Sequence, residues 1–179
     1  MFLDESGLLM APLVRRTWAL RGQTPVLWQR TRSSEKVSAI AALTVSPRRH
    51  RVRVYVSLLA NRNVRTPQLR RFLGALRRHV RGPMILIWDR LSVHRAKPLR
   101  EWMAHHRGFD AVFLPPYSPD LNPVELFWSW LKYHRLANFA AVDVRQLTRE
   151  ARKHLRHARQ RHSLLRSFIQ GTPLSSCLD

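Results

Sequence analysis

Hydrophobic and polar positions along the N-terminal third of the chain follow the spacing of β-strands. Apolar or alternating segments predict a very short strand at 1–3 and longer strands at 36–45 and 52–59. A proline and polar residues at 46–50 predict a hairpin loop between the second and third strands. This part of the chain is therefore expected to form an antiparallel run of strands.

The rest of the chain alternates between helical and strand spacing. Thr66 followed by Pro67 is typical of an N-cap and first helical position, and apolar residues recur at helical spacing up to Gly82. The run MILIW lacks alternation, as expected of a strand buried on both faces. The predicted elements are a helix at 66–80, a strand at 84–88, a helix at 98–106 closed by Gly108, a strand at 111–114, a helix from Pro123 and a helical region at 143–169.

The element order βββαβαβα followed by helices predicts an α/β fold with a mixed sheet flanked by helices. Strand, helix, strand units need crossover connections and place their strands in parallel. This is the element order of ribonuclease-H-like folds. We expect residues 1–140 to form this domain and residues 141–179 to form a basic helical C-terminal extension packed on it.

The charge of the chain narrows the choice of partner. Among 179 residues, 32 are Lys or Arg and 11 are Asp or Glu, which gives a formal net charge of +21. Such a balance favours a polyanion, and no run of about 18 apolar residues indicates a membrane partner. Nucleic acid is the expected partner. The lone Cys177 and the absence of a signal-peptide pattern at the N-terminus favour the cytosol.

Two aspartates follow apolar runs at the ends of predicted strands. Catalytic groups gather at such strand ends, and a desolvated carboxylate costs several kcal/mol unless it is compensated. Asp89 is a candidate metal ligand, although an ion pair with Arg90 or Arg95, or a helix cap, explains it equally well. Asp4 is a weaker candidate, because it precedes a predicted turn and Glu5 is an equally available carboxylate.

A third carboxylate, Glu125, stands at the start of a predicted helix. With Asn122 as N-cap and Pro123 at the first helical position, a capping box is its main alternative role. Together with the two aspartates, however, it offers the oxygen ligands that Mg²⁺ takes. Two such ions are a known solution for phosphoryl transfer.

Further residues are candidates for DNA contact. Five arginines recur at helical spacing and fall on one helix face, where aligned like charge favours phosphate binding over a merely solvated surface. His94, five residues after Asp89, is a candidate for phosphate contact or for orienting the site, with a surface position at a helix start as the alternative. The aromatic residues of 127–133 favour core packing over base stacking. The arginine face consists of Arg145, Arg149, Arg152, Arg156 and Arg159.

Several sequence segments resemble a known family. FLDESG at 2–7, TWALRG at 17–22, IWDRLSVHRAK at 87–97 and LPPYSPDLNPVELFWSWLK at 114–132 resemble the DDE endonuclease domain of bacterial insertion-sequence transposases of the mariner superfamily. The last segment is the most specific, because SPDLNP followed by Val-Glu has little reason to occur by chance. The resemblance extends over roughly residues 1–140, with a weaker match in the helical tail.

The resemblance implies a catalytic site and a reaction. Asp4, Asp89 and Glu125 match the family's catalytic, metal-binding carboxylates. The family implies two Mg²⁺ or Mn²⁺ ions, hydrolysis at transposon ends and strand transfer into target DNA, commonly at TA. Alternatives are a remnant that binds DNA nonspecifically without catalysis, and a nuclease of the same fold.

The resemblance also implies partners. Transposon ends and target DNA are expected, as is a homodimer in the bacterial cytoplasm, associated with the nucleoid. Family members normally carry helix-turn-helix modules before the catalytic domain, and this chain starts only three residues before Asp4. We therefore expect such a module, if required, on a separate polypeptide.

Overall fold

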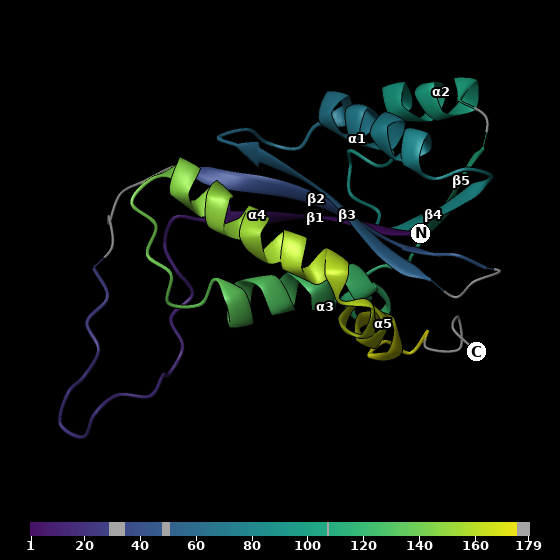
Figure 1. The fold of residues 1–179 in the computed structure, drawn as a ribbon. Coiled ribbons are helices and arrows are strands. Elements are labelled where there is room, and N and C mark those ends of the chain that lie inside the picture. Colours follow the sequence, from purple (N-terminus) through teal and green to yellow (C-terminus); the bar gives the residue numbers. More distant parts are fainter. Residues whose placement is uncertain (29–34, 48–50, 107, 175–179) are drawn as a thin grey trace.

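A mixed five-stranded sheet forms the centre of the protein. The computed structural model describes residues 1–28, 35–47, 51–106 and 108–174 (Figure 1). The strand order is β3-β2-β1-β4-β5, with β1, β2 and β3 antiparallel and with β4 parallel to both β1 and β5. The strands are β1 (Phe2–Leu9), β2 (Lys36–Val45), β3 (Val52–Ala60), β4 (Met84–Trp88) and β5 (Phe109–Phe113).

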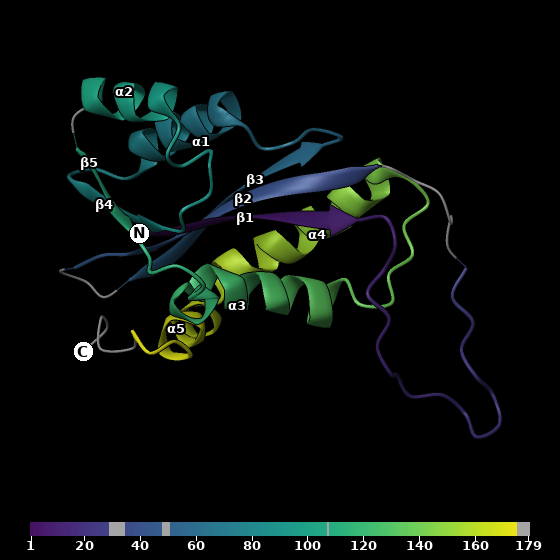
Figure 2. The same ribbon diagram turned by 180° about the vertical axis from the view of Figure 1, so that it is seen from behind.

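Helices cover both faces of the sheet, as seen from the front and from behind (Figures 1 and 2). Helices α1 (Thr66–His79) and α2 (Lys97–His105) lie on one face. The other face carries α3 (Pro123–Ser129), α4 (Val144–Gln160) and α5 (His162–Gln170). A short 3-10 turn (Pro119–Leu121) precedes α3, and a π-helical segment (Trp130–Arg135) continues it. No helix in the described ranges is long and apolar enough to cross a membrane.

The sheet separates two hydrophobic cores. Successive side chains of a strand point to opposite faces, so Phe2 packs into the core with α3, α4 and α5, while Leu3 packs into the core with α1 and α2. The same alternation separates the next two residues. Asp4 therefore faces the α3 layer and Glu5 faces the α1 and α2 layer, where they make different contacts.

Most predicted elements are present, and two strands correct the sequence prediction. β1 continues to Leu9 because it pairs with β2 along its whole length, from Phe2 opposite Leu43 to Leu9 opposite Lys36. β4 is not buried on both faces: Ile85 is 55% exposed and Trp88 is fully buried. The apolar run 84–88 is thus half-covered, because α3, α4 and α5 lie mainly over the antiparallel strands.

The helices also differ in detail from the prediction. The N-cap of α1 is Arg65 rather than Thr66, and the Arg65 N–H donates to the Gln68 side chain. The helical region predicted at 143–169 is two helices that meet at Arg161. Residues 48–50 of the predicted hairpin loop lie outside the described residues. The Ser46 N–H donates to the Arg51 carbonyl across that connection at 3.1 Å.

An extended arm, defined by residues 11–28, leaves the sheet after β1 (Figure 1). Its base is fixed to the end of the α3 region, because the Asn138 side chain accepts a hydrogen bond from Arg15 N at 2.8 Å and donates to Arg15 O at 2.9 Å. Beyond this point Trp18 and Trp28 are 100% and 87% exposed. The arm thus presents apolar side chains away from both cores.

Candidate active site

The parallel pairing of β1 and β4 places two predicted aspartates side by side. Phe2 pairs with Ile87. Asp4 and Asp89 each lie two residues further along their parallel strands, which brings them to the same level. Asp4 is within β1, and Asp89 directly follows β4. This is the central position in the sheet at which the sequence predicted a site.

A cleft joins these aspartates to the predicted glutamate. Asp4, Asp89 and Glu125 all line it, together with the turn at 114–119 and Asn122. Its volume of about 370 Å³ corresponds to roughly a dozen water molecules at about 30 Å³ each. The cleft therefore has room for hydrated ions. The three residues come from a strand, a strand end and a helix start.

Asp4 is the most buried of the three carboxylates. It is 7% exposed, and its Oδ2 accepts a hydrogen bond from the Trp128 indole N–H at 3.0 Å. Burial, followed by the negative charges of Glu125 and Glu5, raises the pKa of Asp4 from 3.8 to about 8. The metal-free site is therefore built to hold a proton on Asp4 at neutral pH.

Asp89 is held by contacts on one oxygen. Its Oδ1 accepts from the Leu91 N–H at 3.0 Å and lies 2.7 Å from His94 Nδ1. Neither Arg90 nor Arg95 forms an ion pair with it among the described residues, so the predicted ion-pair alternative is wrong. The contact to Leu91 is a local turn-type bond, and no described contact uses Oδ2.

Glu125 is not used as part of a capping box. Asn122 is the N-cap of α3, and its side chain accepts from the Val124 N–H at 3.2 Å. The Asn122 N–H is already donated to the Pro119 carbonyl at 2.9 Å, so it does not need the glutamate. Partial burial, partly opposed by Lys132 and reinforced by Asp89, raises the pKa of Glu125. Its carboxylate lines the cleft instead.

Behind Asp89 lies a bridge that the sequence did not predict. The His94 side chain is fully buried, and it lies 2.7 Å from Asp89 Oδ1 and 3.1 Å from Glu5 Oε1. Its ring stacks on Trp88 with a centroid distance of 4.4 Å. Burial alone would lower the pKa of His94, but Glu5 and Asp89 together raise it. An imidazolium satisfies this geometry, because Nε2 donates to Glu5 and Nδ1 donates to the Asp89 backbone carbonyl at 3.1 Å, with the negative charge of Asp89 Oδ1 beside it.

The position of His94 corrects two sequence-based interpretations. With its side chain fully buried, it has no surface to offer a phosphate, and it is not a surface residue at a helix start. Of the roles considered for His94, only that of orienting the site through Asp89 agrees with its position. Glu5 is 89 residues away in sequence, so spacing alone could not have revealed this contact. The only available signal was the position of Glu5 next to Asp4.

The donor set of the cleft fits a hard divalent cation. Carboxylate oxygens are the ligands that Mg²⁺ and Mn²⁺ prefer, and the upward pKa shifts of Asp4 and Glu125 both include repulsion from neighbouring carboxylates. A divalent cation would relieve this repulsion. Among the described residues, no three His, Cys, Asp or Glu side chains are already drawn together as a formed metal site. Ion binding would therefore have to draw the carboxylates together.

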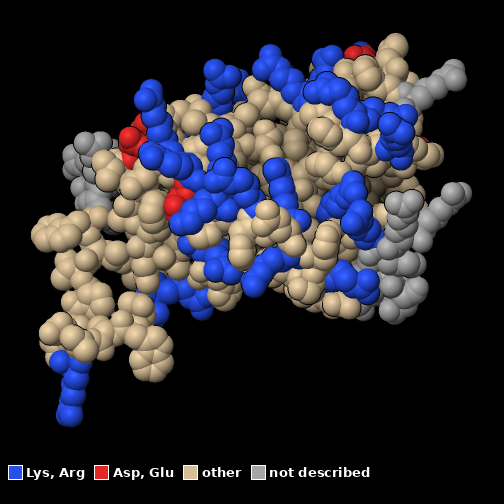
Figure 3. Space-filling view, in the orientation of Figure 1, with Lys and Arg blue, Asp and Glu red and all other residues tan. Residues whose placement is uncertain are grey.

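The predicted arginine face lies on α4 and is exposed along its length. α4 buries Leu147, Ala151, Leu155 and Ala158 against the sheet, so the opposite side of the helix faces solvent. In the view of Figure 3, basic side chains gather over this part of the molecule and acidic ones are few. All five residues of the face are exposed, namely Arg145, Arg149, Arg152, Arg156 and Arg159. Contact with DNA remains a prediction.

The aromatic residues after Glu125 are mostly core residues, as predicted. Phe127 and Trp128 are 0% and 1% exposed, and Trp130 packs beside Phe127 with a ring distance of 6.0 Å. Tyr133 differs, because it is exposed beside the guanidinium of Arg15. Trp128 contacts Asp4, and the faces of these buried rings are not accessible for base stacking.

The mixed sheet and its flanking helices define a ribonuclease-H-like fold. One cleft in this fold is a candidate active site, because it is lined by carboxylates from β1, the end of β4 and the start of α3. The chain belongs to the DDE superfamily endonuclease family, which its sequence matches over residues 1–148. This finding agrees with the resemblance noted in the sequence. No curated protein matches the sequence.

Structures of the Mos1 mariner transposase have a similar fold. The mariner Mos1 paired-end complex with Mn has a TM-score of 0.68 and 18% identity, covering 99% of this chain and 52% of that chain. The Mos1 transposase catalytic domain with Raltegravir and Mg has a TM-score of 0.60 and 16% identity, covering 99% and 78%. The chain thus spans about half the length of the Mos1 chain in the paired-end complex. At this identity the likeness establishes the fold.

Proposed function

We propose that this chain is the catalytic domain of a cut-and-paste DNA transposase, which hydrolyses DNA phosphodiesters and transfers the resulting 3′-hydroxyl into target DNA. The observation that supports this most strongly is the convergence of Asp4, Asp89 and Glu125 on one cleft. Membership of the DDE superfamily endonuclease family supports the assignment of these carboxylates to the cleavage of DNA phosphodiesters. The structures of Mos1 with Mn and Mg support a divalent-metal reaction by analogy.

In this proposal each carboxylate has a defined task. Asp4, Asp89 and Glu125 would hold two Mg²⁺ or Mn²⁺ ions. Such ions, when bound, activate a water or a 3′-hydroxyl and stabilise the leaving oxygen. Asp4, whose pKa of about 8 favours the protonated form at neutral pH, would have to lose that proton in order to hold an ion.

Other residues act on the carboxylates or on DNA. His94 is a positioning residue, since it contacts Asp89 Oδ1 at 2.7 Å and is itself held by Glu5 at 3.1 Å. Trp128 fixes Asp4 through its 3.0 Å hydrogen bond. The arginine face of α4 provides exposed cations for the DNA backbone, so catalysis and DNA attraction come from separate surfaces.

Cleavage of supercoiled plasmid in Mg²⁺ or Mn²⁺ tests the proposal. We expect nicking by the chain and loss of nicking in Asp89→Asn and Glu125→Gln, which preserve shape but remove a charged ligand. Asp110→Asn is the matched control, because Asp110 is exposed on β5 and outside the cleft. Nicking that persists without metal, or in both cleft variants, would contradict the assignment of the site.

The same assay separates the two alternative functions. A remnant without catalysis would bind DNA with strong salt dependence but would not nick it in either metal. A nuclease of the same fold would cut RNA–DNA hybrids or junctions in preference to duplexes that carry transposon ends. A transposase would require the transposon ends for joining, measured as insertion of a labelled 3′-end into a target plasmid.

We also propose that the protein acts as a homodimer. The arm supports this, because its Trp18 and Trp28 are almost fully exposed and such apolar surface commonly marks an interface. The similar Mos1 structure is a paired-end complex, which supports the proposal by analogy. Light scattering during gel filtration should give a dimer mass, and Trp18→Ser with Trp28→Ser should shift it towards the monomer.

A further inference from the structure

A groove follows the outer edge of β3, on a different part of the molecule from the carboxylate cleft. Two hollows form it, and they share Tyr55, His79 and Arg159. One continues along β3 and α1 to Arg62, and the other extends from the start of β3 to His162. We call the combined surface the edge groove. None of its lining residues also lines the cleft.

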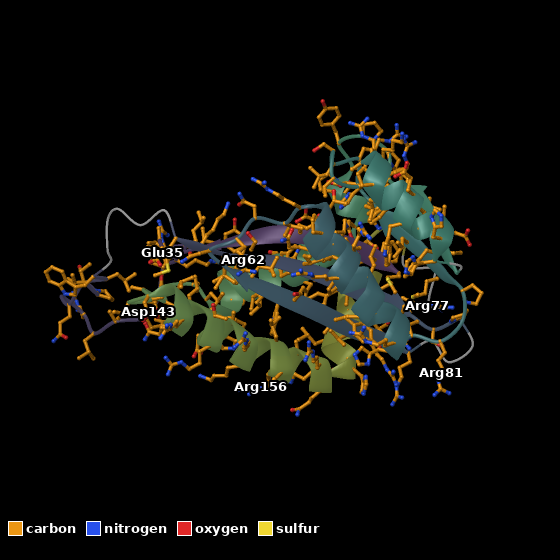
Figure 4. The ribbon with its side chains drawn as sticks, turned by 90° about the horizontal axis from the view of Figure 1, so that it is seen from above. Glu35, Arg62, Arg77, Arg81, Asp143 and Arg156 are labelled. Atoms are coloured by element: carbon orange, nitrogen blue, oxygen red, sulfur yellow. The ribbon has the colours of Figure 1, made fainter. Side chains whose placement is uncertain are left out.

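The edge groove has an open strand at its floor. β3 is the outermost strand on its side of the sheet, and within the described ranges it pairs only with β2. Seen from above, α1 and α4 lie on either side of it, with Arg62 and Arg156 among the basic residues of this region (Figure 4). The walls therefore come from one helix on each face of the sheet.

The chemistry of the edge groove is that of an anion-binding surface. Among the described residues, five arginines line it and no Asp or Glu does. None of these guanidinium groups forms an ion pair with another part of the described chain. The histidines His79 and His162 add further donors. The arginines are Arg51, Arg53, Arg62, Arg71 and Arg159.

Charge alone would not single out a groove in a protein with a net charge of +21, but shape and continuity do. Arg159 belongs both to the edge groove and to the exposed arginine face of α4. The two surfaces therefore form one basic track. A concave track of arginines without acids matches a phosphate backbone, since the guanidinium fork binds phosphate oxygens in pairs.

The length of the edge groove indicates a duplex rather than a small anion. Arg53 and Arg62 are nine positions apart, and a strand rises about 3.3 Å per residue, which gives an upper limit of roughly 30 Å. One turn of B-DNA is about 34 Å long. Arg62 lies two residues beyond the end of β3, so the groove offers cations over less than one helical turn, whereas a free phosphate would need only two or three of them.

The edge groove lies apart from the cleft in which the DNA strand would be cut. Asp4 pairs with Ala41, and Ala41 pairs with Val56 on β3. With about 4.8 Å between neighbouring β-strands, roughly 10 Å separates β1, which carries Asp4, from β3. The two surfaces share no residue, so DNA in the edge groove does not have to pass through the cleft.

We propose that the edge groove binds the backbone of a duplex DNA segment other than the strand engaged in the cleft. The inference rests on the proposed function for the identity of the polyanion as DNA. The groove serves as a second contact surface that holds DNA through phosphates, without reading its sequence. Binding here requires neither metal ions nor the three carboxylates.

Binding of a fluorescent duplex of about 30 base pairs, measured by anisotropy in EDTA over about 50 to 200 mM salt, tests the proposal. The groove variant is Arg53→Gln with Arg71→Gln. The matched control is Lys97→Gln with Arg100→Gln, which removes the same charge from exposed positions at the start of α2. The only described partner among these side chains is the exposed Lys97–Glu101 pair at 3.8 Å, which is worth little to stability.

We expect the groove variant to bind roughly tenfold or more weakly and its salt slope to be less steep by about 2, since each lost phosphate contact removes about 0.9. The control should keep the slope of the unaltered protein. Arg53→Lys with Arg71→Lys should retain most of the binding, because it keeps both charges. Equal losses in the groove and control variants would overturn the proposal.

The result is independent of cleavage. If the chain does not nick plasmid but the groove variant loses DNA binding selectively, the edge groove stands and the catalytic proposal fails. If nicking depends on the carboxylates but the groove variant and the control variant bind DNA alike, the catalytic proposal stands and the proposal of DNA binding in the edge groove fails.

Discussion

Ionisation of the buried Asp4 carboxylate carries an electrostatic cost. Its carboxylate is buried on β1 near Glu5 and Glu125, and its pKa is raised to about 8. In the unfolded chain its pKa is near 3.8, so the folded state binds this proton more tightly. By linkage, ionisation of Asp4 opposes folding, and stability falls as pH rises from about 4 to about 8.

Asp4→Asn should therefore stabilise the metal-free protein at high pH while abolishing cleavage. The amide can still accept a hydrogen bond from Trp128 but carries no charge to desolvate. We expect a melting temperature several degrees higher than that of the unaltered protein at about pH 9 in EDTA, and little difference near pH 4.

The control for this comparison is Asp110→Asn, which changes an exposed carboxylate on β5. It should leave the melting temperature nearly unchanged at both pH values. If Asp4→Asn lowers the melting temperature at pH 9, the burial cost assigned to Asp4 is wrong.

His94 holds Asp89 by one ring nitrogen and Glu5 by the other. Each amide side chain can replace one of these two contacts. Asn at position 94 is short and places a donor near the position of Nδ1, which contacts Asp89. Gln is longer and places a donor near the position of Nε2, which contacts Glu5. Residues that orient a metal ligand commonly contribute 10-fold to 100-fold to metal affinity or activity. The two substitutions therefore distinguish positioning of Asp89 from general packing.

We expect His94→Asn to retain more metal-dependent cleavage than His94→Gln, with His94→Ala reduced by roughly 10-fold to 100-fold. The concentration of Mn²⁺ needed for half-maximal nicking should rise in the same order. His157→Asn, at an exposed position on α4, is the control. Equal activity of the Asn and Gln variants would indicate that His94 only fills space against Trp88.

At the scale of residues, the sequence could indicate which carboxylates line the cleft but not how they are supported. Asp89 after an apolar run and Glu125 within SPDLNPVE were recognisable from local pattern and resemblance. The partners of Asp4 and His94 were not, because Trp128 and Glu5 are 124 and 89 residues distant from them. Such contacts depend on the packing of strands that local spacing does not encode.

Among the elements, α3 is connected to β1 by the hydrogen bond from Trp128 to Asp4 and by the one from its N-cap Asn122 to Leu3. Asn122 is 3% exposed, its carbonyl oxygen accepts from Val124 N at 3.2 Å and its amide donates to the Leu3 carbonyl at 3.3 Å. It therefore caps the helix that carries Glu125 and ties it to the strand that carries Asp4. Both carboxylates depend on this connection for their relative position.

Asn122→Ala should lower the free energy of unfolding by about 1 to 3 kcal/mol, because it removes an N-cap and leaves a buried carbonyl without its donor. Urea unfolding followed by tryptophan fluorescence measures the change. Asn122→Ser keeps a side-chain oxygen that can cap the helix but not the amide donor to Leu3, and its stability should fall between those of the unaltered protein and Asn122→Ala. A stability equal to that of the unaltered protein would show that the connection is not needed.

The elements differ in how well the sequence predicts them. β2 and β3 keep a regular apolar pattern and were predicted almost to their ends. β1 was predicted too short, because Asp4, Glu5 and Ser6 interrupt its apolar pattern for the sake of the site while its backbone continues to pair with β2. β4 is wholly apolar but buried on one face only, since burial depends on which helices cover the sheet.

Across the whole molecule, metal binding and stability should be coupled through pH. Because Asp4 has to lose a proton before it can serve as a ligand, divalent-metal affinity should rise as pH increases towards its pKa of about 8. A ligand that binds only the folded state raises the melting temperature by mass action. Removal of metal should reverse the effect.

We therefore expect Mn²⁺ to raise the melting temperature more at about pH 8.5 than at about pH 6.5, as measured by differential scanning fluorimetry. Chelation with EDTA should remove the increase at both pH values. Asp89→Asn should show a much smaller increase, measured against its own melting temperature in EDTA. A metal effect that is larger at the lower pH would contradict the proton exchange at Asp4.

The open edge of β3 also has a consequence for the solubility of the molecule. An unpaired edge strand is a template for pairing with the edge of another copy, and proteins commonly block such edges with charged side chains. Arg51 and Arg53, exposed at the start of β3, place like charges where two copies would meet. The arginines that line this edge therefore oppose aggregation as well, and a bound polyanion would cover the strand that their mutual repulsion otherwise protects.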